Sequence, residues 1–183
     1  MNVGFSFLLF TLWPDTVQRA VSKQRLTSQD KNTVLAAVKD IKVEQKVEAT
    51  PLLLDILAST QDASIRNASA MALSDLHVIE LVPVVSKLLQ DESLLSCAGT
   101  LIYALRHLDY SSILSELARV VDKGSYEATL MVLMLFEDLP THTDNYKILL
   151  ALDILKRDFS SQEDKIKRSY IKKAIRVLEE HIS

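Results

Sequence analysis

The side chains with the greatest capacity for chemistry are one cysteine and four histidines. Cys97 and His107 would form a nucleophile–base pair if their side chains met. They are ten residues apart on one predicted helix, which turns them to opposite sides and separates them by about 15 Å along the axis. The histidines lie too far apart in the chain for a local metal motif; they are His77, His107, His142 and His181. We therefore expect no metal site and no covalent catalysis.

Other catalytic patterns are also missing from the sequence. With three glycines, the chain has no Gly-rich phosphate-binding loop and no Gly-x-Ser-x-Gly elbow. Adjacent carboxylates occur at Asp91-Glu92 and Glu137-Asp138, but neighbouring residues on a helix point in different directions. We therefore expect a protein that is not an enzyme, that needs no cofactor, and that acts by binding.

The composition favours an all-α protein. The chain has only three Gly and four Pro in 183 residues, although 48% of its residues are hydrophobic. Strand-and-turn proteins need many Gly and Pro turns, whereas helical proteins do not. The single cysteine excludes an internal disulfide and a Cys-rich zinc site, and it suits a reducing compartment. We expect one helical domain in the cytoplasm.

Charge is distributed unevenly along the chain, although the formal net charge is only −3. Residues 49–155 contain fourteen Asp and Glu against six Lys and Arg, a net charge of −8. Residues 1–48 and 156–183 are mildly basic, with net charges of +2 and +3. An acidic surface repels phosphate backbones and attracts basic proteins. We expect a basic protein partner and no nucleic acid; the alternative is that these charges only keep the fold soluble.

An almost wholly apolar run occupies residues 3–13. No Lys or Arg precedes it, and Pro14-Asp15 follows it in place of a signal-peptide cleavage site. The run is also too short to span a bilayer. We expect it to cover the open first end of a helical array and to contact no membrane. Export is the alternative.

Apolar residues at helical spacing predict two alternating types of helix. The first type is expected at 51–59, 79–90, 110–121 and 145–157, and the second type at 64–76, 92–108 and 125–139. Ser160 and Glu163 form a capping box that predicts a last helix to about residue 181. The outer side of this helix is basic, which indicates a solvated face or, alternatively, an anion-binding surface.

These segments repeat at a nearly fixed period. The aspartates that begin them are 32, 29 and 31 residues apart: Asp30, Asp62, Asp91 and Asp122. The leucines that close them are 32 and 31 residues apart: Leu76, Leu108 and Leu139. Such a period indicates a solenoid of helical pairs, in which stacked neighbours bury each other's apolar sides.

The segment from Asp62 to Leu73 resembles the second helix of HEAT-like α-solenoid repeats. Its sequence, Asp-Ala-Ser-Ile-Arg-Asn-Ala-Ser-Ala-Met-Ala-Leu, is similar to that family's Asp-x-x-Val-Arg-x-x-Ala-x-x-Ala-Leu. In the family the Asp and Arg support the turn and the neighbouring repeat, which is the role the resemblance implies for Asp62 and Arg66. The later copies keep the Asp but have Leu95 and Tyr126 near the place of the Arg.

The predicted fold is a single all-α domain over residues 1–183. We expect a short right-handed α-solenoid of about five stacked antiparallel helix pairs, with a plain irregular helical bundle as the alternative. Its parts are an N-terminal cap region at 1–27, repeats at 28–159 and a C-terminal capping helix at 160–183.

The side of the second-type helices opposite their apolar stripe is the predicted binding surface. The HEAT-like resemblance implies that these helices line a concave side. At the repeat period Met71, Tyr103 and Met134 align, with an acidic edge beside them. The predicted partner-binding residues are Met71, Asp75, Thr100, Tyr103, His107, Met131, Met134 and Asp138. The alternative is that the methionines only pack inside a tight superhelix.

The resemblance also implies classes of function. Small HEAT-like proteins include bacterial immunity proteins, which cover the active site of a toxin, often a basic nuclease. We therefore predict a protein, monomeric alone, that forms a tight complex with a basic protein such as a toxin nuclease domain. The alternatives are a HEAT-like enzyme of the DNA alkylation-repair or bilin-lyase type, and an adaptor or assembly factor.

Overall fold

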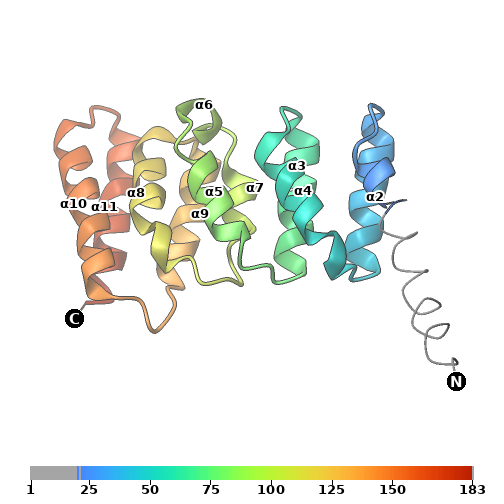
Figure 1. Ribbon diagram of the computed structural model, residues 1–183. Coiled ribbons are helices and arrows are strands. Elements are labelled where there is room, and N and C mark those ends of the chain that lie inside the picture. Colours follow the sequence, from blue (N-terminus) through green and yellow to red (C-terminus); the bar gives the residue numbers. More distant parts are fainter. Residues whose placement is uncertain (1–19, 21, 183) are drawn as a thin grey trace, which may run out of the picture. The chain divides into compact units, whose positions relative to one another are not determined.

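The computed structural model describes residue 20 and residues 22–182. Within this part of the chain every regular element is a helix, which confirms the predicted all-α class (Figure 1). The chain divides into two compact units, Met1–Leu76 and His77–Ser183, named unit 1 and unit 2 below. The predicted cap at residues 3–13 lies outside the described residues.

Unit 1 includes α2 (Lys31–Val43), the 3₁₀ turn η1 (Val47–Ala49), α3 (Thr50–Ser59) and α4 (Ala63–Asp75), and residues 22–26 before α2 are also helical. Helix α4 packs against both α2 and α3. The apolar residues that predicted these helices form their shared core, and each of the following is at most 2% exposed: Val38, Ile41, Leu53, Leu57 and Leu73. Burial of these side chains supplies the main stabilisation of unit 1.

Aspartates begin two helices of unit 1, as the repeat predicted. Asp30 caps α2 by accepting a hydrogen bond from the backbone N–H of Thr33 at 2.9 Å. Asp62 caps α4 by accepting from two backbone N–H groups of the first turn, at 2.8 and 3.0 Å. These N–H groups have no partner within the helix. Asp62 also pairs with Lys31 at 2.9 Å, so one carboxylate joins the starts of α4 and α2.

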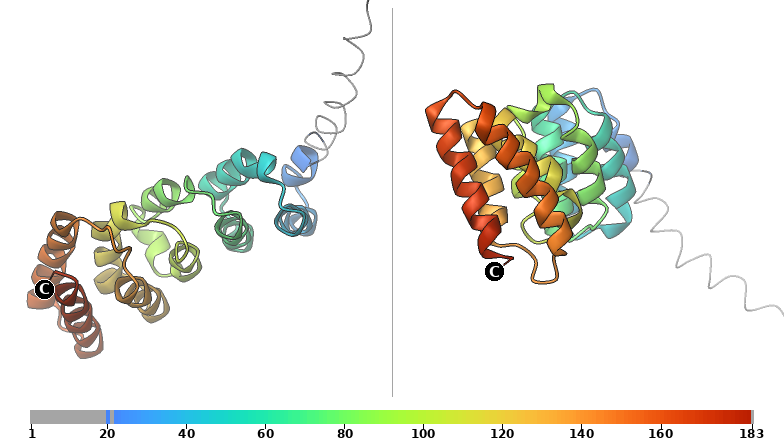
Figure 2. Two further views of the ribbon diagram at one scale, coloured as in Figure 1. Left: turned by 90° about the horizontal axis from the view of Figure 1, so that it is seen from below. Right: turned by 90° about the vertical axis from the view of Figure 1, so that its left-hand side faces the viewer.

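Unit 2 consists of α5 (Leu81–Leu88), α6 (Glu92–Leu95), α7 (Gly99–Tyr103), the 3₁₀ turn η2 (Ser111–Ile113), α8 (Leu114–Lys123), α9 (Tyr126–Glu137), α10 (Asn145–Ser161) and α11 (Lys165–Glu180). The first-type helices α8 and α10 contact each other, and so do the second-type helices α7 and α9. Helix α11 packs against α8, α9 and α10. Figure 2 shows α10 and α11 side by side, nearest the C-terminus.

Helix α8 provides the central apolar surface of unit 2. It contacts α9, α10 and α11. Its buried residues are each at most 1% exposed: Leu114, Leu117, Ala118, Val120 and Val121. On its polar side, Glu116 accepts a hydrogen bond from Ser86 of α5 at 2.9 Å. Helices α9, α10 and α11 therefore pack around α8, which α6 also contacts.

The continuous helix predicted at 92–108 is wrong. The structure divides this segment into α6 and α7, with turns between them and after α7. Serine and glycine are weak helix formers away from helix ends, and Gly99 begins α7 instead of continuing α6. After α7, the N–H of Leu105 donates to the Ile102 carbonyl at 3.0 Å, which is the tighter 3₁₀ pattern. The uniform rotation used to predict the binding side therefore does not hold throughout this segment.

Asp91 caps α6 as predicted, but the predicted helix start at Asp122 is wrong. Asp122 lies within α8, and its carboxylate accepts a hydrogen bond from the Gln162 side chain. Gly124 is the C-cap of α8, and a side chain there would be crowded, because a Cβ would lie 2.6 Å from the Val120 carbonyl oxygen. Ser125 caps α9 in place of Asp122.

The capping box predicted at Ser160 is also wrong. Helix α10 continues to Ser161, and Asp164 caps α11 by accepting from two first-turn N–H groups at 2.8 and 3.1 Å. The Ser160 hydroxyl instead donates to the Lys156 carbonyl at 3.0 Å, inside α10. A serine that bonds to the preceding turn continues a helix, whereas the capping box requires it to begin one.

Replacement of Asp62 tests its double role in unit 1. We expect Asp62→Ala to lower the midpoint of thermal unfolding by roughly 2–4 °C, because it removes a helix cap and the pair with Lys31. Circular dichroism measures this change. Asp55→Ala is the matched control, because Asp55 is an exposed aspartate of α3 in the same unit. An equal shift in the control would contradict the assignment.

Candidate protein-binding face

Helices α7 and α9 of unit 2 pack against each other. Their exposed sides together form the candidate face. Their apolar sides are at most 2% exposed at Leu101, Ile102, Val132, Leu133 and Phe136. This burial fixes the rotation of both helices and leaves one side of each toward solvent. The α7–α9 face comprises Thr100, Tyr103, His107, Glu127, Leu130, Met131, Met134 and Asp138.

Six of the eight predicted partner-binding residues lie on the α7–α9 face. The exposed members of this group are Tyr103, His107 and Asp138, and the half-buried members are Thr100, Met131 and Met134. Half-buried methionines contribute to the packing of α9 and also present flexible, polarisable side chains to solvent. The α7–α9 face thus has an adaptable apolar centre.

The other two predicted residues, Met71 and Asp75, belong to unit 1. Both are half-buried on α4. Asp75 pairs with Lys42 of α2 at 2.6 Å, so a lysine compensates its charge within unit 1. The predicted alignment of Met71 with Tyr103 and Met134 joins residues of different units and stays a prediction.

Leu130 is a member of the face that the sequence analysis did not single out for binding. It is 46% exposed and lies on α9 with Met131 and Met134. The available signal was the run Leu130–Phe136, because a helix that is apolar on every side must expose apolar side chains unless it is fully buried. Leu130 extends the apolar centre of the α7–α9 face.

The α7 half of the face carries aromatic side chains and no carboxylate. The Arg106 guanidinium lies 4.1 Å from the centre of the Tyr103 ring and donates to the Tyr103 carbonyl at 3.2 Å. The His107 ring stacks with His77, with 6.4 Å between the ring centres. Negative charge on this face is therefore concentrated at the ends of α9, at Glu127 and Asp138.

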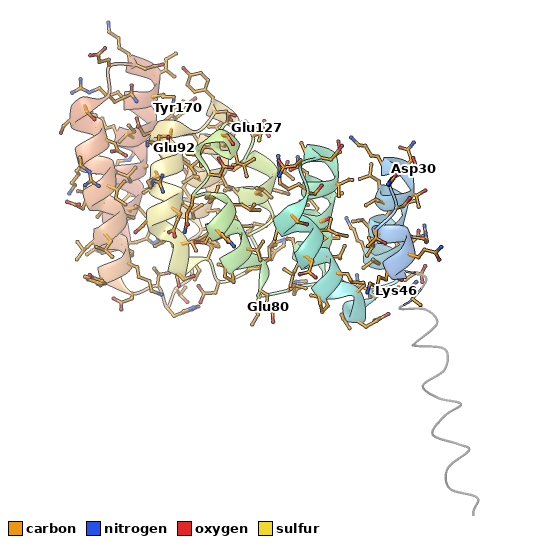
Figure 3. The ribbon with its side chains drawn as sticks, turned by 45° about the horizontal axis from the view of Figure 1, so that its top comes forward. Asp30, Lys46, Glu80, Glu92, Glu127 and Tyr170 are labelled. Carbon is orange, nitrogen blue, oxygen red and sulfur yellow. The ribbon has the colours of Figure 1, made fainter. Side chains whose placement is uncertain are left out.

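Helix α11 covers the other flank of α9. Tyr126 lies against Tyr170, with 6.1 Å between the ring centres, and its hydroxyl bonds to the carboxylate that caps α11 at 3.2 Å. Toward the other end of α9, Glu137 pairs with Lys173 at 2.8 Å. Figure 3 shows Glu127 and Tyr170 at the same end of these neighbouring helices. Helix α9 is therefore held by α7 on one flank and by α11 on the other.

Side chains from other elements bind the carbonyl groups at the C-terminal end of α9. The buried Tyr110 hydroxyl donates to the carbonyl oxygens of Leu135 and Asp138, at 2.7 and 2.5 Å. His181 Nε2 donates to the Phe136 carbonyl at 2.8 Å. The last carbonyl groups of a helix have no partners within it, so these contacts fix the end of α9 and the position of Asp138.

Asp109 connects the segment before η2 to the loop after α9. Its carboxylate pairs with His142 at 2.9 Å and accepts the Ser111 backbone N–H at 3.0 Å. The hydrogen bond with His142 lowers the pKa of the Asp109 carboxyl to about 2. Burial raises the pKa of the adjacent Tyr110, so its hydroxyl stays protonated and keeps donating.

The α7–α9 face offers contacts for docking: aromatic and apolar side chains between two carboxylates. Among the described residues, no group of three or more His, Cys, Asp or Glu side chains gathers as metal ligands would. The described helices include none that is long and apolar enough to cross a membrane. No protein-family model, curated protein or solved structure matches the chain.

Removal of the Tyr110 hydroxyl tests how the end of α9 is held. We expect Tyr110→Phe to lower the free energy of unfolding by about 1–3 kcal/mol, because a buried hydroxyl that bonds to two carbonyl groups is lost. Urea denaturation measures this change. Tyr146→Phe is the control, because Tyr146 is 65% exposed. A loss of similar size in the control would show that the buried hydrogen bonds are not its cause.

The Asp109–His142 pair predicts a dependence on acid pH. The folded-state pKa of Asp109 is lowered, so the pair stabilises the fold above about pH 4, and this contribution is lost as the pH falls toward 2. Both side chains are more than half exposed, so the effect is small and salt weakens it. We expect His142→Gln to raise the pKa of Asp109 toward its ordinary value of 3.8, measured by carboxyl ¹³C NMR. A pKa that stays near 2 would assign the shift to Ser111 instead.

Proposed function

We propose that this chain is a non-catalytic protein-binding module whose α7–α9 face docks a basic protein. The observation that carries the proposal is the group of Tyr103, Leu130, Met131 and Met134, with exposed carboxylates at both ends of α9. Aromatic and methionine side chains are enriched where protein interfaces are buried, and charged groups are typical of their rims. This arrangement suits a partner with an apolar patch surrounded by lysine and arginine.

The position of Asp138 supports a role in binding. Asp138 is the C-cap residue of α9, where the helix dipole disfavours a negative charge. Its carboxylate is exposed, and no ion pair joins it to another described residue. The fold thus gains little from this charge. A cation of a docked partner would compensate it.

We further propose that the helix pairs belong to one short right-handed HEAT-like α-solenoid. The period of the aspartates and leucines supports this, as do the contacts of α8 with α10 and of α7 with α9. Small proteins of that family include bacterial immunity proteins, so our best candidate for the partner is a basic toxin nuclease domain in the cytoplasm. An acidic inhibitor associates quickly with such a target, because opposite charges steer the encounter.

Capture of the partner and a charge reversal test the proposal. The full chain, immobilised at physiological salt, should retain a basic protein from a native lysate and form an equimolar complex with it. We expect Asp138→Lys and Tyr103→Ala each to weaken this complex about tenfold or more, measured by biolayer interferometry. If the captured protein is a toxin, co-expression of the wild-type chain should restore growth, and Asp138→Lys should not.

The matched control is Asp153→Lys, the same charge reversal at an exposed residue of α10 outside the face. Asp75→Lys is unsuitable, because it would place a lysine beside Lys42 and disturb unit 1. The α7–α9 assignment is wrong if Asp138→Lys leaves the affinity unchanged, or if Asp153→Lys weakens it equally. An acidic captured protein would contradict the proposed class of partner.

A further inference from the structure

The exposed side of α11 carries a concentration of positive charge that the proposed protein-binding face does not use. Between residues 165 and 176 the helix has six lysines and arginines and no acidic residue. The buried side of the same helix already accounts for its packing in unit 2, through Ile171, Ala174, Val177 and Leu178. The packing therefore does not require these charges.

The spacing of the cations is unfavourable for the isolated protein. Arg168, Lys172 and Arg176 are separated by four residues each, so they lie one above another on the same side of α11. Like charges at this spacing destabilise a helix. Lys172 is exposed and forms no ion pair with any described residue. A bound anion would relieve this repulsion.

A surface cavity of about 210 Å³ lies on this side of α11. Its lining residues are Ser169, Lys172, Lys173 and Arg176. Two of the cations reach carboxylates at the margin: Lys173 pairs with Glu137 at 2.8 Å, and Arg176 lies 3.7 Å from Glu180. The remaining lining residues, Lys172 and Ser169, each carry a hydrogen-bond donor and lie on the same helix.

We propose that this cavity binds a small anion that carries phosphate groups. Drug-sized ligands occupy pockets of about 300–1,000 Å³, so a cavity of this size fits a smaller ion. The accessible lining is mostly the carbon stems of the lysine and arginine side chains, and their charged ends, with the Ser169 hydroxyl, are the donors available to phosphate oxygens. The site is separate from the α7–α9 face, and this inference does not depend on the protein partner.

Titration of the full chain tests the proposal. Sodium pyrophosphate is added at constant ionic strength, with isothermal calorimetry for affinity and the backbone amide signal of Ser169 for location. We expect saturable binding that Lys172→Gln and Arg176→Gln each weaken about tenfold. Lys165→Gln is the matched control, because it removes one exposed cation of the same helix outside the cavity lining. We expect it to change the affinity less than twofold.

Further titrations separate the sources of the phosphate. Adenosine diphosphate that binds more tightly than pyrophosphate would identify an organic phosphate, and equal affinity would identify the inorganic group; both support the site. The proposal fails if pyrophosphate does not saturate the protein, or if Lys165→Gln weakens binding as much as Lys172→Gln. It also fails if a short single-stranded oligonucleotide binds more tightly than pyrophosphate and adenosine diphosphate, and if all three variants weaken its binding equally. That result would indicate diffuse attraction of a polyanion to the whole helix.

Discussion

Burial of α8 is the interaction on which unit 2 depends. Its apolar residues, such as Leu117 and Val121, are at most 1% exposed, and the helix contacts α9, α10 and α11. A close-packed interior allows little displacement, so the rotation of each neighbouring helix is set by this shared surface. The side of α9 that faces solvent is thereby determined. The α9 half of the α7–α9 face therefore results from the packing behind it.

Polar contacts then determine where the helices begin and end. Asp62 caps α4 and reaches Lys31 of α2, which joins the starts of two helices. Tyr110 and His181 bind carbonyl groups at the end of α9, where a helix leaves acceptors without partners. These contacts hold Asp138 at the edge of the α7–α9 face. Packing and end contacts together give the candidate face a defined geometry before any partner arrives.

The arrangement of charge differs from what counting along the chain suggests. The net charge of −8 at residues 49–155 is partly compensated by lysines from outside that range, as at Asp62 with Lys31 and at Asp75 with Lys42. The exposed acidic groups of the α7–α9 face lie at the ends of α9, and α11 carries six lysines and arginines. The pair Glu137–Lys173 lies between these two surfaces. The α7–α9 face and the exposed side of α11 therefore differ in the sign of their charge.

The sequence by itself determined the helical class, the caps at Asp30, Asp62 and Asp91, and the apolar sides of α7 and α9. These features depend on local periodicity and on bonds between a side chain and the backbone a few residues away. Only the tertiary structure decided the division of the 92–108 segment, the ends of α8 and α10, the pairing of Asp75 and the exposure of Leu130. Each of these depends on which residues, distant in the chain, cover a given surface. A pattern with a period of one helical turn does not show which distant residues pack against a given side of a helix.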